Sequence, residues 1–176
     1  MLRRWSSGAS RACGACLLGL VLAGCAGYTV GPIQPTFMKD VHRVAVPIFE
    51  NQTHEPDIEA LATTTLIKQL QQDGTYQITR TDQADAEIKG TITDVLRSQA
   101  RALTGNVLAS SEFNLTVRIH LNVVDTRTKA TLGQRDVEGT SRYFVQNDIP
   151  SQERQALPLA VEDASVQAAS FLSEGW

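Results

Sequence analysis

The stretch FNLTVRIHLNV, residues 113–123, decides the fold that this sequence predicts. Every odd-numbered position in it is apolar and every even-numbered position is polar. Because successive side chains of a strand point to opposite faces of a sheet, this period of two predicts a strand with one buried and one wet face. Strands of this kind are typical of antiparallel sheets that are covered on one side only.

Further strands are predicted on both sides of this stretch. Residues 87–96 carry apolar residues among threonines, a polar turn is expected at 125–129, and residues 130–145 carry the last strand. Residues 41–49 are interpreted as another strand, where Pro47 indicates a sheet edge or a bulge because proline cannot donate to a ladder. A short strand is expected at 75–80, followed by a loop at 81–85.

Two segments have helical periodicity. The first begins after Pro56, places Ile58, Leu66 and Leu70 on one face, and ends at Gly74. The second closes the chain with an apolar stripe between positions 157 and 172. The order strand, helix, several strands, helix predicts an α+β fold: a two-layer sandwich of two amphipathic helices packed on a mostly antiparallel sheet of about four strands.

The N-terminal residues have the order of a secretory signal. Arg3, Arg4 and Arg11 precede an apolar run at 15–23, and no acidic residue occurs before Asp40. The run is about half the roughly 20 residues that a membrane-spanning helix needs. Residues 1–24 are therefore predicted to be a cleaved signal peptide.

A cysteine closes this signal. Residues 22–25, Leu-Ala-Gly-Cys, resemble the bacterial lipobox, in which the cysteine is acylated and the chain is cut before it. We therefore expect lipidation at Cys25, a lipidated tether at 25–40 and one α+β domain at 41–176. Ala26 stands where an aspartate is the usual inner-membrane retention signal in enteric bacteria, which favours the outer membrane, on its periplasmic side. A secreted protein with a chance cysteine is the alternative.

Cysteine use and charge exclude several classes of function. Cys13 and Cys16 lie in the segment predicted to be removed, and Cys25 takes the lipid, so no disulfide or cysteine-ligated metal is expected in the domain. Removal of residues 1–24 takes away three arginines and no acid, which changes the net charge from −3 to −6. This acidic balance argues against a nucleic-acid partner, which requires a basic field.

Candidates for catalysis or metal binding are few. His120 is expected on the wet face of its strand. His54 lies in a polar loop near Glu55 and Asp57, which could bind a metal but have no recognised ligand spacing. No nucleophile elbow and no glycine-rich phosphate loop occurs in the sequence. We therefore expect no enzyme and no cofactor; a lipoprotein hydrolase stays open as an alternative that would depend on His54 or Glu55.

Basic residues occur in two segments that are predicted to connect strands. Arg97 and Arg101 belong to residues 97–109, interpreted as an exposed loop, and Arg127 and Lys129 belong to the turn. With Arg135 they could form a patch that meets the anionic phosphates of a lipid head group. The alternative is a pair of solvated loops.

Several segments together resemble a known family. They are GCAGY at 24–28, the strand at 44–51, the helix after Pro56, the segment at 84–92, the alternating strand around Val117 and the closing helix. This set resembles the lipopolysaccharide-assembly lipoprotein family, LptE. The resemblance spans nearly all of the chain after residue 24, although each motif alone is loose.

The resemblance implies two helices on a mostly four-stranded sheet. It also implies an outer-membrane lipoprotein that binds and plugs a large β-barrel translocon, assists its assembly, and helps to insert lipopolysaccharide into the outer leaflet. Only Cys25 is carried over as a matched functional residue; Arg97, Arg101, Arg127 and Lys129 are lipopolysaccharide contacts proposed from location and charge. The alternatives are a binding module for another envelope machine, such as a secretion pore or a cell-wall synthase activator, and a structural spacer.

Overall fold

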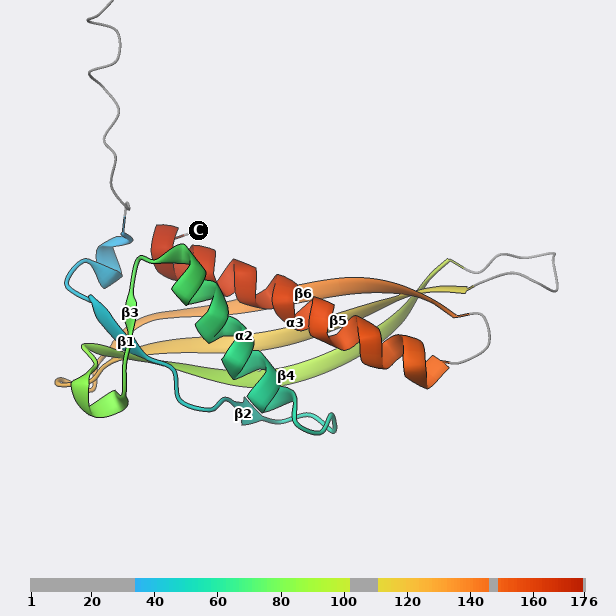
Figure 1. Ribbon diagram of the computed structural model, residues 1–176, viewed down its shortest axis with the longest axis horizontal. Coiled ribbons are helices and arrows are strands. Elements are labelled where there is room, and N and C mark those ends of the chain that lie inside the picture. The colour runs from blue at the N-terminus through green and yellow to red at the C-terminus, as the bar shows by residue number, and fades with distance from the viewer. Residues whose placement is uncertain (1–33, 102–110, 146–148, 176) are drawn as a thin grey trace, which may run out of the picture. The chain divides into compact units, whose positions relative to one another are not determined.

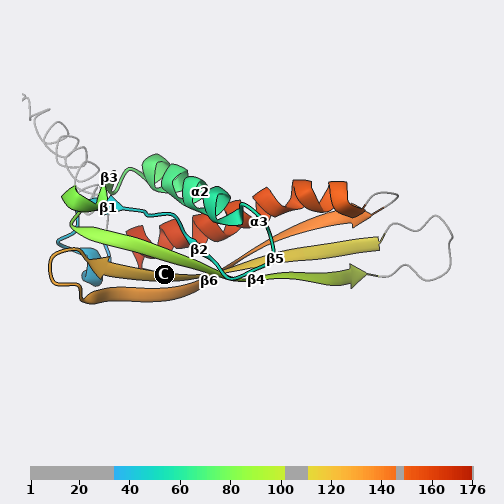
Figure 2. The ribbon, with the colours of Figure 1, turned by 90° about the horizontal axis from the view of Figure 1, so that it is seen from below.

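The computed structural model describes residues 34–101, 111–145 and 149–175. Two long helices, α2 (Ile58–Asp73) and α3 (Ile149–Glu174), lie on one side of a sheet, as Figures 1 and 2 show. The other side of the sheet carries no helix among these residues (Figure 2). The predicted α+β class, with two helices packed on a sheet, is therefore confirmed.

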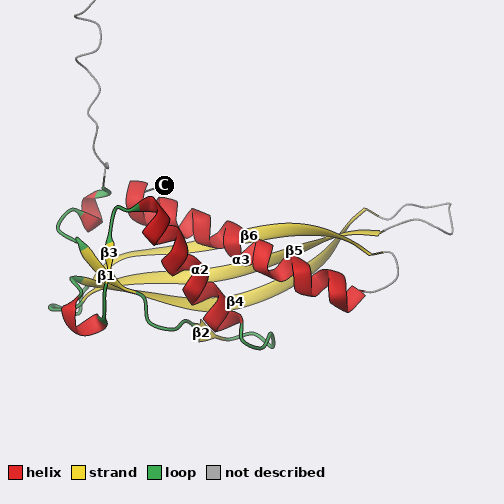
Figure 3. Ribbon diagram, viewed as in Figure 1, coloured by secondary structure: helices red, strands yellow, loops and turns green. Residues whose placement is uncertain are grey.

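The sheet is larger and more mixed than predicted (Figure 3). Three long strands, β4 (Ala86–Arg101), β5 (Ser111–Asp125) and β6 (Thr131–Val145), form an antiparallel group. Three short strands, β1 (Arg43–Ala45), β2 (Glu50–Asn51) and β3 (Gln77–Ile78), pair in parallel. The order is β3-β1-β4-β5-β6, with β2 also on β4. Strands of two or three residues are too short to show a period, which is why about four were predicted.

The single strand predicted at 41–49 is wrong. Ala45 ends β1, Glu50 begins β2, and both strands pair with β4 across the interruption. Pro47 lies inside this interruption, where it removes no ladder hydrogen bond. The break also lets Phe49 turn its ring onto β4 over Gly90, where any Cβ atom would overlap the ring.

The exposed loop predicted to begin at Arg97 is also wrong at its start. The strand β4 continues to Arg101, with Arg97 opposite Leu115 and Gln99 opposite Phe113. An irregularity between Ile92 and Asp94 adds an unpaired residue to the strand. Such a bulge interrupts the alternation along the strand, which explains why the sequence pattern fades there. Residues 102–110 lie outside the described part.

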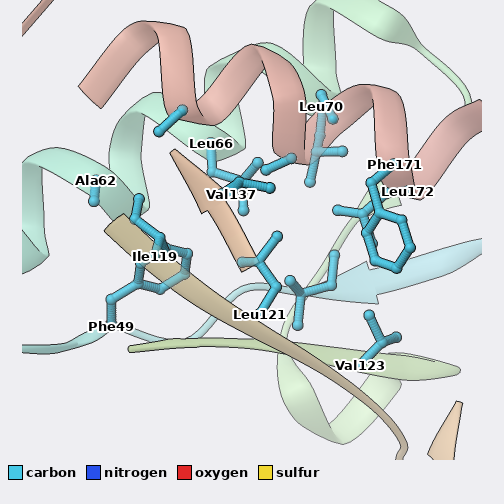
Figure 4. Close-up of a cluster of buried hydrophobic side chains, with 14 of the residues drawn as sticks. Phe49, Ala62, Leu66, Leu70, Ile119, Leu121, Val123, Val137, Phe171 and Leu172 are labelled. Atoms are coloured by element: carbon cyan, nitrogen blue, oxygen red, sulfur yellow. The ribbon is translucent and has the colours of Figure 1, made fainter. Parts of the chain in front are cut away.

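The core lies between the helices and the sheet (Figure 4). Leu66 and Leu70 of α2, Leu121 of β5 and Leu172 of α3 are at most 1% exposed. Four alanines spaced by four residues form the surface of α3 that faces the sheet: 156, 160, 164 and 168. Two of them, Ala160 and Ala164, meet Gly139 of β6, where a Cβ atom would overlap the backbone of α3. Small residues on both elements therefore allow close packing.

The predicted tether extends too far into the domain. Thr36–Met38 form a 3-10 helix, η2, and Met38 is fully buried. Phe37 stacks on Phe171 with ring centroids 5.1 Å apart, and the Arg135 guanidinium lies 5.5 Å from the Phe171 centroid. The packed domain thus includes residues 34–40 as well as the described residues from 41 onward, because Phe37 and Met38 join the core.

Candidate interaction surface

The side of β4, β5 and β6 that faces away from the helices is called the open face, and the opposite side the covered face. Along β5, Leu115, Val117, Ile119, Leu121 and Val123 are at most 2% exposed and belong to the covered face. Their polar neighbours from 114 to 122 belong to the open face. The strand with one buried and one wet face that the sequence predicted is confirmed.

Cross-strand pairs occupy the centre of the open face. The Arg118 guanidinium lies 2.6 Å from the Glu138 carboxylate, and His120 Nδ1 lies 2.6 Å from Asp136 Oδ1. The hydroxyl groups of Thr116 and Thr140 are 3.2 Å apart. Pairs on a half-exposed surface contribute about 0–1 kcal/mol each to stability. They balance charge locally more than they hold the fold together.

The open face also carries groups that a partner could contact. The Oδ1 atoms of Asn114 and Asn122 are enclosed, and neither has a hydrogen-bond partner among the described residues. Phe144 is 56% exposed and belongs to the open face by its register opposite Glu112. Leu96, 42% exposed, lies on the same face. The surface thus offers two apolar side chains, whereas the two amide oxygens are enclosed and are not open to a partner.

A shallow hollow of about 340 Å³ lies on this face. It is lined by Thr93, the added residue of the β4 bulge, and by Arg118, Ile119, Asp136 and Glu138. The bulge therefore places a depression beside the Arg118–Glu138 ion pair and Asp136, the hydrogen-bond partner of His120. Its lining contains both signs of charge, so it favours hydrogen-bonding groups over an ion of one sign.

Arg97 lies on the covered face and is bound by two carboxylates. Its guanidinium forms ion pairs with Glu55, in the loop before α2, and with Glu153, near the start of α3. The Arg97 Nε to Glu153 Oε1 distance is 2.5 Å. The hydrogen bond that Arg97 donates to Glu153 is the main cause that raises the pKa of Arg97. Arg97 therefore joins the loop before α2 and the start of α3 to β4.

The four basic residues proposed as a patch do not lie together. Arg127 and Lys129 are exposed at the turn between β5 and β6, next to the start of β4 at Ala86. Arg97 is eleven residues further along β4, which corresponds to about 35 Å of strand. The main chain of Arg101 ends β4, but its side chain lies outside the described part. A single patch of all four is therefore excluded as a structural unit.

A second hollow, of about 480 Å³, lies at this turn. Lys39, Asp40, Asp125 and Arg127 are among the residues that line it. The Asp125 carboxylate accepts hydrogen bonds from the amides of Thr128 and Arg127; the bond from Thr128 is the main cause that lowers the pKa of Asp125. The lining of this hollow therefore includes two basic side chains, Lys39 and Arg127, as well as the acidic side chains Asp40 and Asp125.

The turn end of the sheet is tied together by Asp85. Its carboxylate accepts hydrogen bonds from the amide of His42 at 3.2 Å and from the amide and guanidinium of Arg43, both at 2.8 Å. The side-chain bond from Arg43 is the main cause that lowers the pKa of Asp85 to about 2. Asp85 therefore links β1 to β4, a role that the sequence did not indicate.

Metal-binding and membrane-anchoring features, both considered from the sequence, are not found among the described residues. Within residues 34–101, 111–145 and 149–175, no three histidine, cysteine or acidic side chains are arranged to hold a metal ion. Glu55, a candidate ligand beside His54, is engaged by Arg97. Cys25, the predicted lipidation site, lies outside the described residues. No helix of the described part is both long and apolar enough to span a membrane.

The sequence did not reveal the partners of Arg118, His120 and Arg97, although the pattern of the sequence contained a clue to two of them. A turn at 125–129 between two alternating segments implies an antiparallel hairpin, whose register places His120 opposite Asp136 and Arg118 opposite Glu138. The link from Arg97 to Glu55 and Glu153 could not be found in this way, because it depends on how the two helices pack.

Comparison with known families gives one match. The sequence model of the family described as LptE, Lipopolysaccharide-assembly, matches residues 41–170. No curated protein has a sequence that matches this chain significantly.

Solved structures share the fold at low sequence identity. A PelC dodecamer from Paraburkholderia phytofirmans has a TM-score of 0.50 at 16% identity, over 82% of this chain and 96% of that chain. A homologue of neuraminyllactose-binding hemagglutinin from Helicobacter pylori has a TM-score of 0.55 at 14% identity, over 84% and 90%. Hypothetical protein CT253 from Chlamydia trachomatis has a TM-score of 0.54 at 9% identity, over 77% and 99%. At these identities the likeness concerns the fold alone.

Proposed function

Since the chain belongs to the lipopolysaccharide-assembly family LptE, we propose that it is an outer-membrane lipoprotein that binds and plugs a large β-barrel translocon. In this role it assists assembly of the barrel and the insertion of lipopolysaccharide into the outer leaflet. Lipid on Cys25 holds it on the periplasmic side. The family match over residues 41–170 is the single observation that carries this proposal.

The open face supports the proposal physically and is the surface that we assign to the barrel. The lumen of a membrane β-barrel is polar, so a domain that enters it must present polar side chains without a large desolvation cost. The open face meets this condition because Arg118 and Glu138, and His120 and Asp136, already form pairs. Phe144 and Leu96, exposed on the same face, would find apolar contact with a partner.

Lipopolysaccharide contact is proposed for the basic residues at the two ends of the sheet. Arg127 and Lys129 are exposed at one end and could meet phosphates directly, since charge-assisted bonds to phosphate are strong. Arg101 is placed at the other end by its backbone. Arg97 would first have to leave Glu55 and Glu153, so it is expected to contribute less.

The contact proposal is tested with variants that separate these ends. Lipopolysaccharide binding by the full chain is measured for Arg127→Glu/Lys129→Glu, for Arg101→Glu and for Arg97→Glu. We expect the turn variant to weaken binding more than Arg97→Glu does. Unchanged affinity in all three would refute the assignment of these residues without touching the barrel proposal.

The barrel proposal is tested by copurification. The tagged full chain is isolated from native outer membranes, and the recovered partners are compared for the wild type, Thr116→Arg and Thr64→Arg. Thr116 lies at the centre of the open face, while Thr64 is exposed on α2. Near-equal recovery of a large β-barrel protein, reduced by Thr116→Arg and kept by Thr64→Arg, is expected.

One alternative partner class follows from the same experiment. Recovery of a secretion pore or a cell-wall synthase without a large barrel would favour a binding module for another envelope machine. Equal loss of the barrel in both threonine variants would keep the barrel as partner and refute the open face as the contact.

A further inference from the structure

The strand β6 forms one edge of the sheet, since it pairs with β5 on one side only. An edge strand presents unpaired amide and carbonyl groups, which can pair with a strand of another molecule. β6 spans Thr131–Val145, which makes it a long edge. If the outer edge of β6 is not to pair with a strand of another molecule, its amide and carbonyl groups must be covered by another part of the chain.

Two side chains of α3 bind the outer edge at its centre. Asp163 Oδ2 accepts a hydrogen bond of 2.9 Å from the amide of Thr140, and Gln167 Nε2 donates one of 2.6 Å to the carbonyl of Glu138. The same amide of Gln167 lies 3.5 Å from Asp163 Oδ2. Together they occupy one donor and one acceptor of the edge, the Thr140 amide and the Glu138 carbonyl, which a neighbouring strand would use.

The match follows from the periods of the two elements. Four residues of an α-helix rise about 6 Å, and two residues of a strand rise about 6.6 Å. Residues 163 and 167 on α3 therefore fall in step with 140 and 138 on β6, which runs the other way. Gly139 lies between the two bound residues and lets the backbone of α3 approach, because a Cβ there would overlap Ala160 and Ala164.

We propose that the outer edge of β6 is a latent strand-binding surface that Asp163 and Gln167 keep closed, and that its partner is β6 of a second copy of this chain. In an antiparallel register centred on Gly139, Glu138 lies opposite Thr140, and Asp136 lies opposite Arg142 twice by symmetry. Opposite charges across a strand pair are favourable. This inference does not depend on which partner the open face binds.

The first test uses a labelled peptide with the sequence of residues 131–145 as the probe. Its binding to the full chain is measured for the wild type, for Asp163→Ala/Gln167→Ala, and for the matched control Glu162→Ala/Gln155→Ala on exposed positions of α3. We expect at least a tenfold lower Kd for the first double variant and no change for the control. A folded double variant that binds the peptide no better than the wild type would overturn the proposal.

The second test needs no peptide, because it measures the hydrogen exchange of a single backbone amide at the edge of β6. Hydrogen exchange of the Thr140 amide should be slow although no strand covers it, and Asp163→Ala should accelerate this exchange at least tenfold. The amide of Ile119, inside the sheet, serves as the internal control and should not change. Equal exchange of Thr140 in the wild type and in Asp163→Ala would contradict closure by this side chain.

Discussion

The covered face and the open face of β5 are built from alternate residues of one strand, yet the first is apolar and buried and the second is polar and partly exposed. Leu121 is fully buried against the helical layer, while its neighbour Asn122 belongs to the open face. Burial of apolar area supplies most of the free energy of folding, whereas half-exposed polar pairs add little. The comparison teaches that the residues that bury the core and the polar residues of the open face alternate along one strand, so the two sets should respond separately to substitution.

The largest difference between the faces should appear at this pair. Leu121→Ala removes a buried side chain and leaves a cavity, so it should lower the free energy of unfolding by about 2–5 kcal/mol. Asn122→Ala should change it by less than about 1 kcal/mol, because Asn122 is only partly buried and its Oδ1 has no hydrogen bond to lose within the described residues. Chemical denaturation of both variants measures the difference. Equal losses would break the division into two faces.

The close packing of α3 gives the next largest effect. Gly139→Ala places a Cβ atom against the backbone of α3, so the helix or the strand must move. We expect a loss of about 1–3 kcal/mol in unfolding free energy, as for other overpacked sites. Gly74→Ala is not a suitable control, because Gly74 has φ +76 and is strained for other residues. Thr140→Ala, next in the strand but on the open face, should cost less in the same denaturation assay.

The ion pairs at the turn end predict a pH dependence. The pKa of Asp85 is lowered in the folded chain from 3.8 to about 2, so its stabilising effect is complete above pH 4 and is lost as the pH falls towards 2. Asp85→Asn should therefore lose about 1–2 kcal/mol at neutral pH, the worth of hydrogen bonds to a charged group. Unfolding free energies of both chains, measured from pH 7 to pH 2, should converge at the acid end. A constant difference would contradict the assignment.

Arg97 tests whether the covered face also uses charge. Arg97→Ala leaves Glu55 and Glu153 without their shared cation, and since the three side chains are partly exposed we expect a loss of about 1 kcal/mol. Arg142, whose side chain is 74% exposed on the open face, is the matched arginine. Arg142→Ala should have a smaller effect on the midpoint of chemical denaturation. A larger effect of Arg142→Ala would reverse the comparison.

The smallest effect on stability is expected at the centre of the open face. Exchange of the pair, Arg118→Glu with Glu138→Arg, keeps the attraction between strands and should change the unfolding free energy by at most about 0.5 kcal/mol. If the open face contacts the barrel, the same exchange should lower the yield of the copurified partner. If the exchanged pair leaves both the unfolding free energy and the yield of the copurified barrel unchanged, the open face is not the contact with the barrel.

The sequence predicted the elements whose patterns are long. The alternation of 113–123 gave the covered and open faces of β5, and Gly74 ends α2 as expected, in a left-handed conformation with its amide bonded to Leu70. The short parallel strands were not predictable in number, because two or three residues carry no period. The inclusion of Met38 in the core was hidden by the prolines and glycines around it.

The candidate surface was predictable only in part. Its polar residues on β5 follow from the alternation, and the hairpin register gives their partners on β6. The links made by Arg97, Asp163 and Gln167 could not be derived, because each depends on the position of a helix relative to the sheet. Sequence position and charge grouped Arg97 with Arg127, but the fold places these two residues at opposite ends of the sheet.

The most direct test of the proposed role is site-specific photo-crosslinking in native outer membranes. A crosslinker replaces Arg118, at the centre of the open face, in the full tagged chain, and the crosslinked product is identified by mass spectrometry. We predict one dominant product with a large outer-membrane β-barrel protein. A dominant product with a secretion pore or a cell-wall synthase, and none with such a barrel, would contradict the account.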